Sequence, residues 1–338
     1  MVAVVCALVA YTVRVEAGLT GAPPLAAAYD AILDARFDRA EQVLREACPP
    51  APVGACAALR AVSASWEILI NPESTALDAR FSNLAAAAIA QNEAWTGREP
   101  QRAEAWFYLA GAYAPRAQWR VLRGERLAAA FDGKKIKDAL EHALRLDGTL
   151  YDAYFGIGLY HYYADVAPTA AKALRWLLFL PGGNRVKGMQ EMLQARDRGE
   201  LLKGEADYQI QVVELWYEQN AAGAIRRLEA LDARYPHNPL FRQRIAEARE
   251  IYLHDHAGSA AAWQELLARA RAGSVQAPRA TEIRARLGLA SMYASMNRVH
   301  DAIDEWNRVI EMRPTEPVDA LARAQRELRA ASAQRGRQ

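Results

Sequence analysis

The sequence has almost no excess of charge of either sign. Lysine and arginine together number 42, and aspartate and glutamate 40, which gives a formal net charge of +2. A chain without a basic excess has no strong field to draw in nucleic acid, so a nucleic-acid-binding function is disfavoured. Disorder is disfavoured as well, because 52% of the residues are hydrophobic and 24% are charged. The composition predicts a folded protein.

Sustained alternation of polar and apolar residues, the pattern of a half-buried β-strand, is also missing. Instead, alanine, leucine, arginine and glutamate recur throughout, and all four favour helices. Clusters of proline and glycine divide the chain into segments of helical length, for example at Pro49 to Gly54, Gly97 to Pro100 and Pro236 to Pro239. We therefore expect an all-α protein.

An apolar run, Met1 to Val13, opens the sequence, but it is too short for a membrane-spanning helix. Small residues in Val15-Glu16-Ala17 stand where a signal peptidase would require them. No lysine or arginine precedes the run, which leaves two alternatives, a start farther upstream or a buried helix. The pattern predicts a signal peptide or N-terminal anchor over residues 1–17. We expect an exported protein, periplasmic or associated with the cell envelope, and a cytoplasmic one if the segment is not a signal.

Only three cysteines are present, and cleavage of the leader would remove Cys6. Cys48 and Cys56 would remain, separated by the proline-rich loop 49–55. In an oxidising compartment this pair can form a disulfide, which would stabilise the fold by about 2–3 kcal/mol through loop entropy. The alternative is two small buried thiols in a reduced protein. Zinc is disfavoured, because no second pair of ligands lies at metal-binding spacing.

Catalytic motifs are missing too. No nucleophile-elbow sequence accompanies the scattered histidines, and carboxylate pairs such as Glu205 and Asp207 are ordinary on polar helix faces. His254-Asp255-His256 does not predict a metal site, because residues two apart point to different sides of a helix and no third ligand is evident. We therefore expect a protein that is not an enzyme and has no cofactor or metal.

What the chain does contain is a recurring set of small, aromatic and turn residues. The most complete copy is Leu289, Ala290, Tyr293, Asn297, Ala302, Trp306, Val309 and Pro314. Partial copies at equivalent offsets are Trp106-x2-Leu109-Ala110-x2-Tyr113, Tyr154-x2-Ile157-Gly158-x2-His161 and Ala224-x3-Leu228 followed by Pro236. This pattern resembles the tetratricopeptide repeat (TPR) family, whose 34-residue unit is a pair of antiparallel helices.

The resemblance implies an irregular TPR-like α-solenoid of antiparallel helical hairpins, continuous over residues 25–330. A flexible basic tail is expected at residues 331–338. Stacked hairpins of this kind leave a long concave surface, so the implied activity is binding.

Two spacings depart from a regular repeat. Between Tyr113 and Ala139 the chain holds more residues than a hairpin turn needs, so this stretch must lengthen the helices or form an excursion. The interval from Pro236 to Pro314 is not a whole number of standard repeats. We expect an irregular solenoid that curls on itself.

A narrower resemblance covers the segment from Phe155 to Met189. Here Phe155-Gly156-Ile157-Gly158-Leu159-Tyr160-His161-Tyr162-Tyr163 leads to Leu177-Leu178-Phe179-Leu180-Pro181-Gly182-Gly183-Asn184-Arg185-Val186-Lys187-Gly188-Met189. The segment is similar to the centre of the eukaryotic tetratricopeptide-repeat-thirty-nine and Iml2-like group, which is associated with lipid and inclusion handling. Because function must be argued from a site, this likeness implies fold only.

The resemblance also selects candidate binding positions, because the first helix of each TPR hairpin lines the concave groove. The positions selected are Phe107, then Phe155, Leu159, Tyr162 and Tyr163, and finally Leu287 and Ser291. Tyrosine rings with polar tips can contact an apolar peptide or acyl chain and keep a hydrogen-bonding end. The alternative is that these rings fill the core between hairpins.

A second candidate is a basic ridge. Arg116, Arg120 and Arg123 lie at helical spacings of four and three, so one helix face would present them together to a carboxylate or phosphate. The alternative is a solvated face balanced by nearby acids. A weaker anion site is Pro181-Gly182-Gly183-Asn184-Arg185, before an expected helix, with a tight interhelical turn as its alternative.

These features together predict a non-catalytic protein-binding scaffold or adaptor in the bacterial cell envelope. Its partner would be a protein client that offers a peptide or a helix to the concave groove. One alternative is a lipid or small-molecule carrier with an aromatic-lined cavity. The other is an enzyme whose site is assembled from distant helices.

Overall fold

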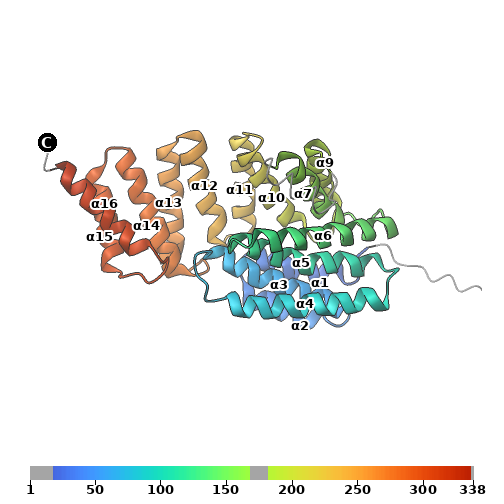
Figure 1. Ribbon diagram of the computed structural model, residues 1–338. Helices are drawn as coiled ribbons and strands as arrows, with labels where there is room; N and C mark the ends of the chain where they lie inside the picture. Colours follow the sequence, from blue (N-terminus) through green and yellow to red (C-terminus); the bar gives the residue numbers. More distant parts are fainter. Residues whose placement is uncertain (1–17, 168–181, 336–338) are drawn as a thin grey trace, which may run out of the picture.

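A computed structural model describes residues 18–167 and 182–335 of the chain. These residues form fifteen α-helices and no strand, which confirms the predicted all-α class (Figure 1). The helices are α1 (Ala22–Leu33), α2 (Phe37–Ala47), α3 (Val53–Ile70), α4 (Asp78–Arg98), α5 (Ala103–Leu122), α6 (Arg126–Leu146), α7 (Ala153–Val166), α9 (Arg185–Arg198), α10 (Lys203–Trp216), α11 (Ala221–Arg234), α12 (Pro239–Leu253), α13 (His256–Arg271), α14 (Pro278–Ser295), α15 (Val299–Glu311) and α16 (Ala320–Arg335).

The hairpin of α10 and α11 shows how the sequence pattern produces a repeat unit. Asn220 begins α11, and its side chain accepts a hydrogen bond from the Gly223 amide at 3.0 Å, which satisfies one free helix-end donor. Ala224 and Leu228 are fully buried on the face that packs against the neighbouring helices. Pro236 stands two residues after the last helical residue, where the chain must leave the helix.

Glycines let α7 and α9 approach to backbone contact. A Cβ atom added to Gly158 would lie 2.7 Å from the carbonyl oxygen of Gly188, and one added to Gly188 would lie 2.6 Å from the carbonyl oxygen of Gly158. No real side chain tolerates such distances, so both positions require a hydrogen in place of Cβ. The predicted small position at Gly158 therefore serves close helix packing.

Both departures from a regular repeat have local explanations. The extra residues after Tyr113 lengthen α5 and α6 to 20 and 21 residues, joined by a short turn at 123–125. The interval from Pro236 to Pro314 holds two hairpins, α12–α13 and α14–α15. The residues beyond two standard repeats lie in α14, which has 18 residues, and in the connection at 272–277.

The N-terminal helices fold back against the later repeats. In Figure 1, α1 to α4 lie as a layer along one side of the row formed by α10 to α12. Trp66 of α3 packs against Tyr208 of α10 and Phe241 of α12, with ring centroids 5.0 and 6.2 Å away. All three rings are buried. α10 and α12 are the first helices of two successive hairpins, and first helices were predicted to line the groove. Both turn this face toward the chain's own α3.

Polar contacts extend this junction along the row. The side chain of Asn238, which is fully buried, donates to the carbonyl oxygen of Leu33 at 2.7 Å. Tyr235 donates to Asp30 at 2.7 Å. Farther along, Arg284 of α14 donates to the carbonyl oxygen of Ile70 at 2.7 Å. Each contact joins residues more than 200 positions apart, so the solenoid curls on itself as predicted.

Glu205 of α10 lies inside the same junction. Its carboxylate accepts hydrogen bonds from Tyr29 at 3.2 Å, from Trp66 at 3.1 Å and from Gln209 at 3.3 Å. Burial raises the pKa of Glu205 above its ordinary value, and these hydrogen bonds offset only part of that effect. No local pattern predicts the burial of Glu205, because its partners Tyr29 and Trp66 come from helices distant in the chain.

The boundaries of the helical region differ slightly from the prediction. α16 continues to Arg335, five residues past the expected boundary at 330, because alanines sustain the helix and Ala331 is buried. The predicted leader at 1–17, the last residues of the predicted tail and the segment 177–181 of the narrower resemblance lie outside the described residues.

Within the described residues, α3 is the one helix that is long and apolar enough to cross a membrane by length and composition. About 61% of it is buried inside the protein, as expected of a core helix.

We predict that Gly158→Ala destabilises the protein by about 1–3 kcal/mol, because the new methyl group meets backbone atoms that cannot move freely. Gly111→Ala in α5 is the matched control, since a Cβ atom there meets nothing within 4 Å. The control should be neutral or stabilise by up to about 1 kcal/mol, because alanine favours the helix. Urea unfolding followed by circular dichroism measures both, and equal effects would contradict the close approach of α7 and α9.

We predict that Glu205 makes the stability of the protein depend on pH. Because its folded-state pKa is raised, its favourable contribution is complete below the pKa of an unfolded glutamate, about 4.3, and is lost as pH rises through the folded value. Relative to Glu205→Gln, the wild-type protein should therefore lose stability as pH rises above about 4. Urea unfolding at several pH values, with the exposed Glu46→Gln as surface control, tests this. Parallel curves for wild type and Glu205→Gln would contradict it.

Candidate functional site

The aromatic positions selected for client binding lie in the core. Tyr162 is fully buried, Phe107 is 5% exposed and Phe155 is 9% exposed. Tyr162 packs edge-on against both Tyr163 and Tyr217, with ring centroids 5.8 Å apart in each pair, and its hydroxyl donates to Glu218. The core alternative describes these residues. Phe155 and Tyr162 lie on the face of α7 that packs against α9 and α10, and Phe107 of α5 belongs to the main core.

The remaining groove positions are only partly accessible. Leu159 and Tyr163 are half-buried against the same cluster, and burial raises the pKa of Tyr163 to about 12. Leu287 is buried and Ser291 is half-buried on α14. A client would have to displace packed helices to contact most of the predicted patch. The sequence could not separate groove from core, because ring residues at helical spacing fit both.

The predicted arginine ridge is engaged inside the protein. Arg116 and Arg120 of α5 both bind the carboxylate of Asp132 in α6, at distances of 2.7 to 3.0 Å. Asp132 is only 2% exposed, so neither arginine is a free surface charge. Arg123 instead binds Asp78 at the start of α4 through two nitrogens, at 2.7 and 2.8 Å. The ridge therefore joins three helices and is not a vacant anion site.

Carboxylates held by two arginines recur along the chain, a feature that the sequence reasoning missed. The sets are Asp132 with Arg116 and Arg120, Asp207 with Arg196 and Arg227, Asp232 with Arg242 and Arg269, and Glu305 with Arg286 and Arg308. The middle two sets each join three helices, and the other two join the helices of one hairpin. The arginines of these sets therefore have structural partners inside the protein.

The other weak candidates are also structural. Asn184 begins α9 and accepts from the Lys187 amide, while the Arg185 amide donates to Asp165, so this helix end already has its acceptors. Pro181 of that motif lies outside the described residues. Asp255 begins α13 and accepts from Gly258, and no group of three potential ligands is arranged for a metal in the residues the structure describes.

Cys48 and Cys56 form a disulfide, with their Cα atoms 6.6 Å apart. The bond joins the end of α2 to the first turn of α3. It holds these two helices together at one end of the N-terminal layer.

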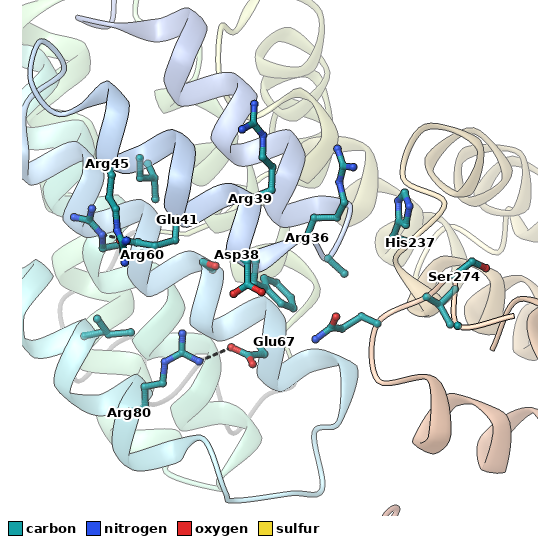
Figure 2. Close-up of a pocket in the computed structure, with 18 residues that line it drawn as sticks. Arg36, Asp38, Arg39, Glu41, Arg45, Arg60, Glu67, Arg80, His237 and Ser274 are labelled. Atoms are coloured by element: carbon teal, nitrogen blue, oxygen red, sulfur yellow. Dashed lines mark hydrogen bonds and ion pairs between the residues drawn. The ribbon is translucent and has the colours of Figure 1, made fainter. Parts of the chain in front are cut away.

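An open cleft of about 940 Å³ lies beside this pair of helices (Figure 2). One wall comes from α2, α3 and α4, and the other from the connections before α12 and α14. The lining residues are Ala35, Arg36, Phe37, Asp38, Arg39, Glu41, Leu44, Arg45, Arg60, Ser63, Glu67, Arg80, Leu84, His237, Gly273, Ser274, Val275 and Gln276. Sequence reasoning missed the cleft, because its walls are about 150 or more positions apart in the chain.

Five arginines and three carboxylates line this cleft. Glu41 accepts from Arg45 and from Arg60, at 2.9 Å each. Burial acts to raise the pKa of Glu41, but the two arginines outweigh it, so the pKa lies below its ordinary value. Glu41 is therefore a carboxylate at neutral pH and holds two guanidinium groups side by side, as Figure 2 shows.

The opposite wall of the cleft carries a histidine paired with an acid. His237 Nδ1 lies 2.8 Å from Asp34, an arrangement that can orient a catalytic base. The nearby Ser274 hydroxyl, however, donates to the carbonyl oxygen of Arg269 at 3.0 Å. Among the described residues no hydroxyl or thiol is hydrogen-bonded to His237, so the cleft presents no nucleophile and base pair.

No protein-family model matches the chain, and no curated protein matches it in sequence. Solved structures do match. The Cut9 and Hcn1 hetero-tetramer of the APC/C is similar at a TM-score of 0.50 and 12% identity, covering 90% of this chain and 48% of that one. The C-terminal part of a TPR repeat-containing protein from Cytophaga hutchinsonii has a TM-score of 0.43 at 15% identity, covering 88% and 98%. Yeast Tom70 has a TM-score of 0.30 at 13% identity, covering 82% and 64%.

The chain thus spans about half the length of the first of these structures. At 12% identity the likeness concerns the fold alone. It agrees with the stacked antiparallel hairpins and with the small residues at their close contacts. The chain is a TPR-like helical-repeat protein.

Proposed function

We propose that this chain is a non-catalytic scaffold that binds a protein partner on its outer surfaces. The observation that carries the proposal is the self-filled inner face. Tyr208 and Phe241, on the face where a peptide would lie, are covered by Trp66 of the chain's own α3. A peptide or partner helix would therefore bind outside this region, and the cleft beside α2 and α3 is one large open surface among the described residues.

We also infer that the protein is exported to the cell envelope. The Cys48–Cys56 disulfide supports this, because such bonds persist in oxidising compartments. The apolar run before Val15-Glu16-Ala17 supports it independently as a leader or anchor.

The carrier alternative receives no comparable support. An acyl chain or small molecule would need a cavity lined by the rings around Tyr162, yet these rings contact one another directly. The cleft has five arginines and three carboxylates among its lining residues and is open to solvent.

The scaffold proposal is tested by chemical crosslinking of the full-length protein in its native cells, followed by affinity purification and mass spectrometry. We expect one or a few proteins to recur across replicates, with crosslinks on the outer surface. The absence of any recurring protein would contradict the proposal, and a stoichiometric extracted small molecule would then favour the carrier.

We predict that the disulfide stabilises the protein by about 2–3 kcal/mol, because it restricts the unfolded chain. The variant with Cys48→Ala and Cys56→Ala should lose this amount in urea unfolding, and reductant should lower wild-type stability without affecting the variant. Protein purified from the envelope should have neither thiol reactive toward a maleimide before reduction. Two reactive thiols in that material would contradict the inferred oxidising compartment.

A further inference from the structure

We infer that the arginine-lined cleft between α2–α4 and the connections before α12 and α14 binds an extended, carboxylate-rich segment of the partner protein. The inference rests on the proposed scaffold function and names the chemistry of its partner. It places the binding site away from the inner face of the solenoid, which Trp66 covers.

Free donor capacity in the cleft is the first support. Arg45 uses Nε for Glu41, Arg60 uses Nε for the same carboxylate, and Arg80 uses Nη1 for Glu67. An arginine has five N–H donors, so each guanidinium keeps donors for a ligand carboxylate. Arg39 has a weaker internal partner, the side-chain amide of Gln42 at 2.9 Å.

Accessibility is the second support. The side chains of Arg45 and Arg80 are 74% and 57% exposed, so a ligand can reach them without any movement of the helices. These exposed pairs contribute little to folding, which allows a ligand carboxylate to compete for the same arginines. By contrast, Arg116 and Arg120 are committed to a buried acid and cannot be recruited in this way.

The mixture of charges selects a peptide over a polyphosphate. Asp38, Glu41 and Glu67 line the same cleft and would repel a continuous row of phosphates. A peptide can place carboxylates opposite the arginines and apolar side chains against the half-buried Phe37 and Leu84. The volume of the cleft, about 940 Å³, is at the upper end of the range for ligand sites and suits a short stretch of extended chain.

Fluorescence polarisation with the full-length protein tests this. The probe is a fluorescein-labelled ten-residue peptide of alternating glutamate and leucine, and its matched control carries glutamine in place of glutamate. We expect binding of the glutamate peptide that weakens with added sodium chloride, and little binding of the glutamine peptide. Equal binding of both peptides, or none of either, would overturn the inference.

Matched variants locate the binding. Removal of two cleft charges in Arg45→Gln/Arg80→Gln should weaken binding about tenfold, on the scale of charge-assisted hydrogen bonds. The double variant Arg326→Gln/Arg329→Gln removes the same charge from exposed positions of α16 and should change binding less than twofold. Equal loss in both variants would show general charge attraction and overturn the site. Far-UV circular dichroism confirms that each variant is folded.

A gain of affinity provides a test that unfolding cannot imitate. Asp38→Asn removes an exposed negative charge from the cleft and should tighten binding of the glutamate peptide about two- to threefold. Unchanged or weaker binding would contradict the inference. Displacement of the peptide by a few millimolar inorganic phosphate would also contradict it, because the cleft would then be a small-anion site.

The same variants separate this inference from the scaffold proposal. If crosslinking recovers a recurring partner and Arg45→Gln/Arg80→Gln leaves its capture unchanged, the scaffold function stands and the assigned cleft is wrong. If no partner recurs, the scaffold proposal itself fails.

Discussion

The architecture depends on the burial of Trp66 between Tyr208 and Phe241. This contact closes the N-terminal layer against the repeats and converts an open row of hairpins into a body that curls on itself. The contact brings the N-terminal layer close to α10 and α12, and the polar contacts around it depend on this proximity. Glu205 receives two of its hydrogen bonds from the N-terminal layer, and Asn238 reaches the end of α1. Open solenoids are held by neighbouring repeats alone, whereas this chain adds contacts between distant repeats.

Charge plays a mainly structural part in this molecule. A nearly neutral chain contains several carboxylates that are each held by two arginines, and these sets fix helices whose packing faces are built largely from alanine. A buried acid such as Asp232 depends on both partners, because loss of one leaves part of a buried charge unsatisfied. The cleft differs in this respect, since its arginines are exposed and their internal pairs are easily exchanged.

Much of the fold could be predicted from local sequence, because its determinants are local. The small residue at Gly158 and the proline after α11 mark close packing and helix exit wherever they occur. The site could not be predicted in the same way. Tyr162 matches a groove position and a core position equally well, and its burial depends on α9 and α10. Arg120 was expected to form an exposed ridge, yet its partner Asp132 is determined by how two long helices pair. The cleft combines residues 35–84 with 237–276, and no local pattern reports that contact.

The central claim is that the N-terminal layer covers the inner face of the repeats, and a double-mutant cycle on Trp66 and Tyr208 tests it most directly. Trp66→Leu, Tyr208→Leu and the double variant are compared with the wild-type protein by urea unfolding. Direct ring contact predicts that the two single effects do not add, with a coupling energy of about 0.5–1.5 kcal/mol. Additive effects within about 0.3 kcal/mol would show that the rings do not touch in solution and would contradict the self-filled inner face.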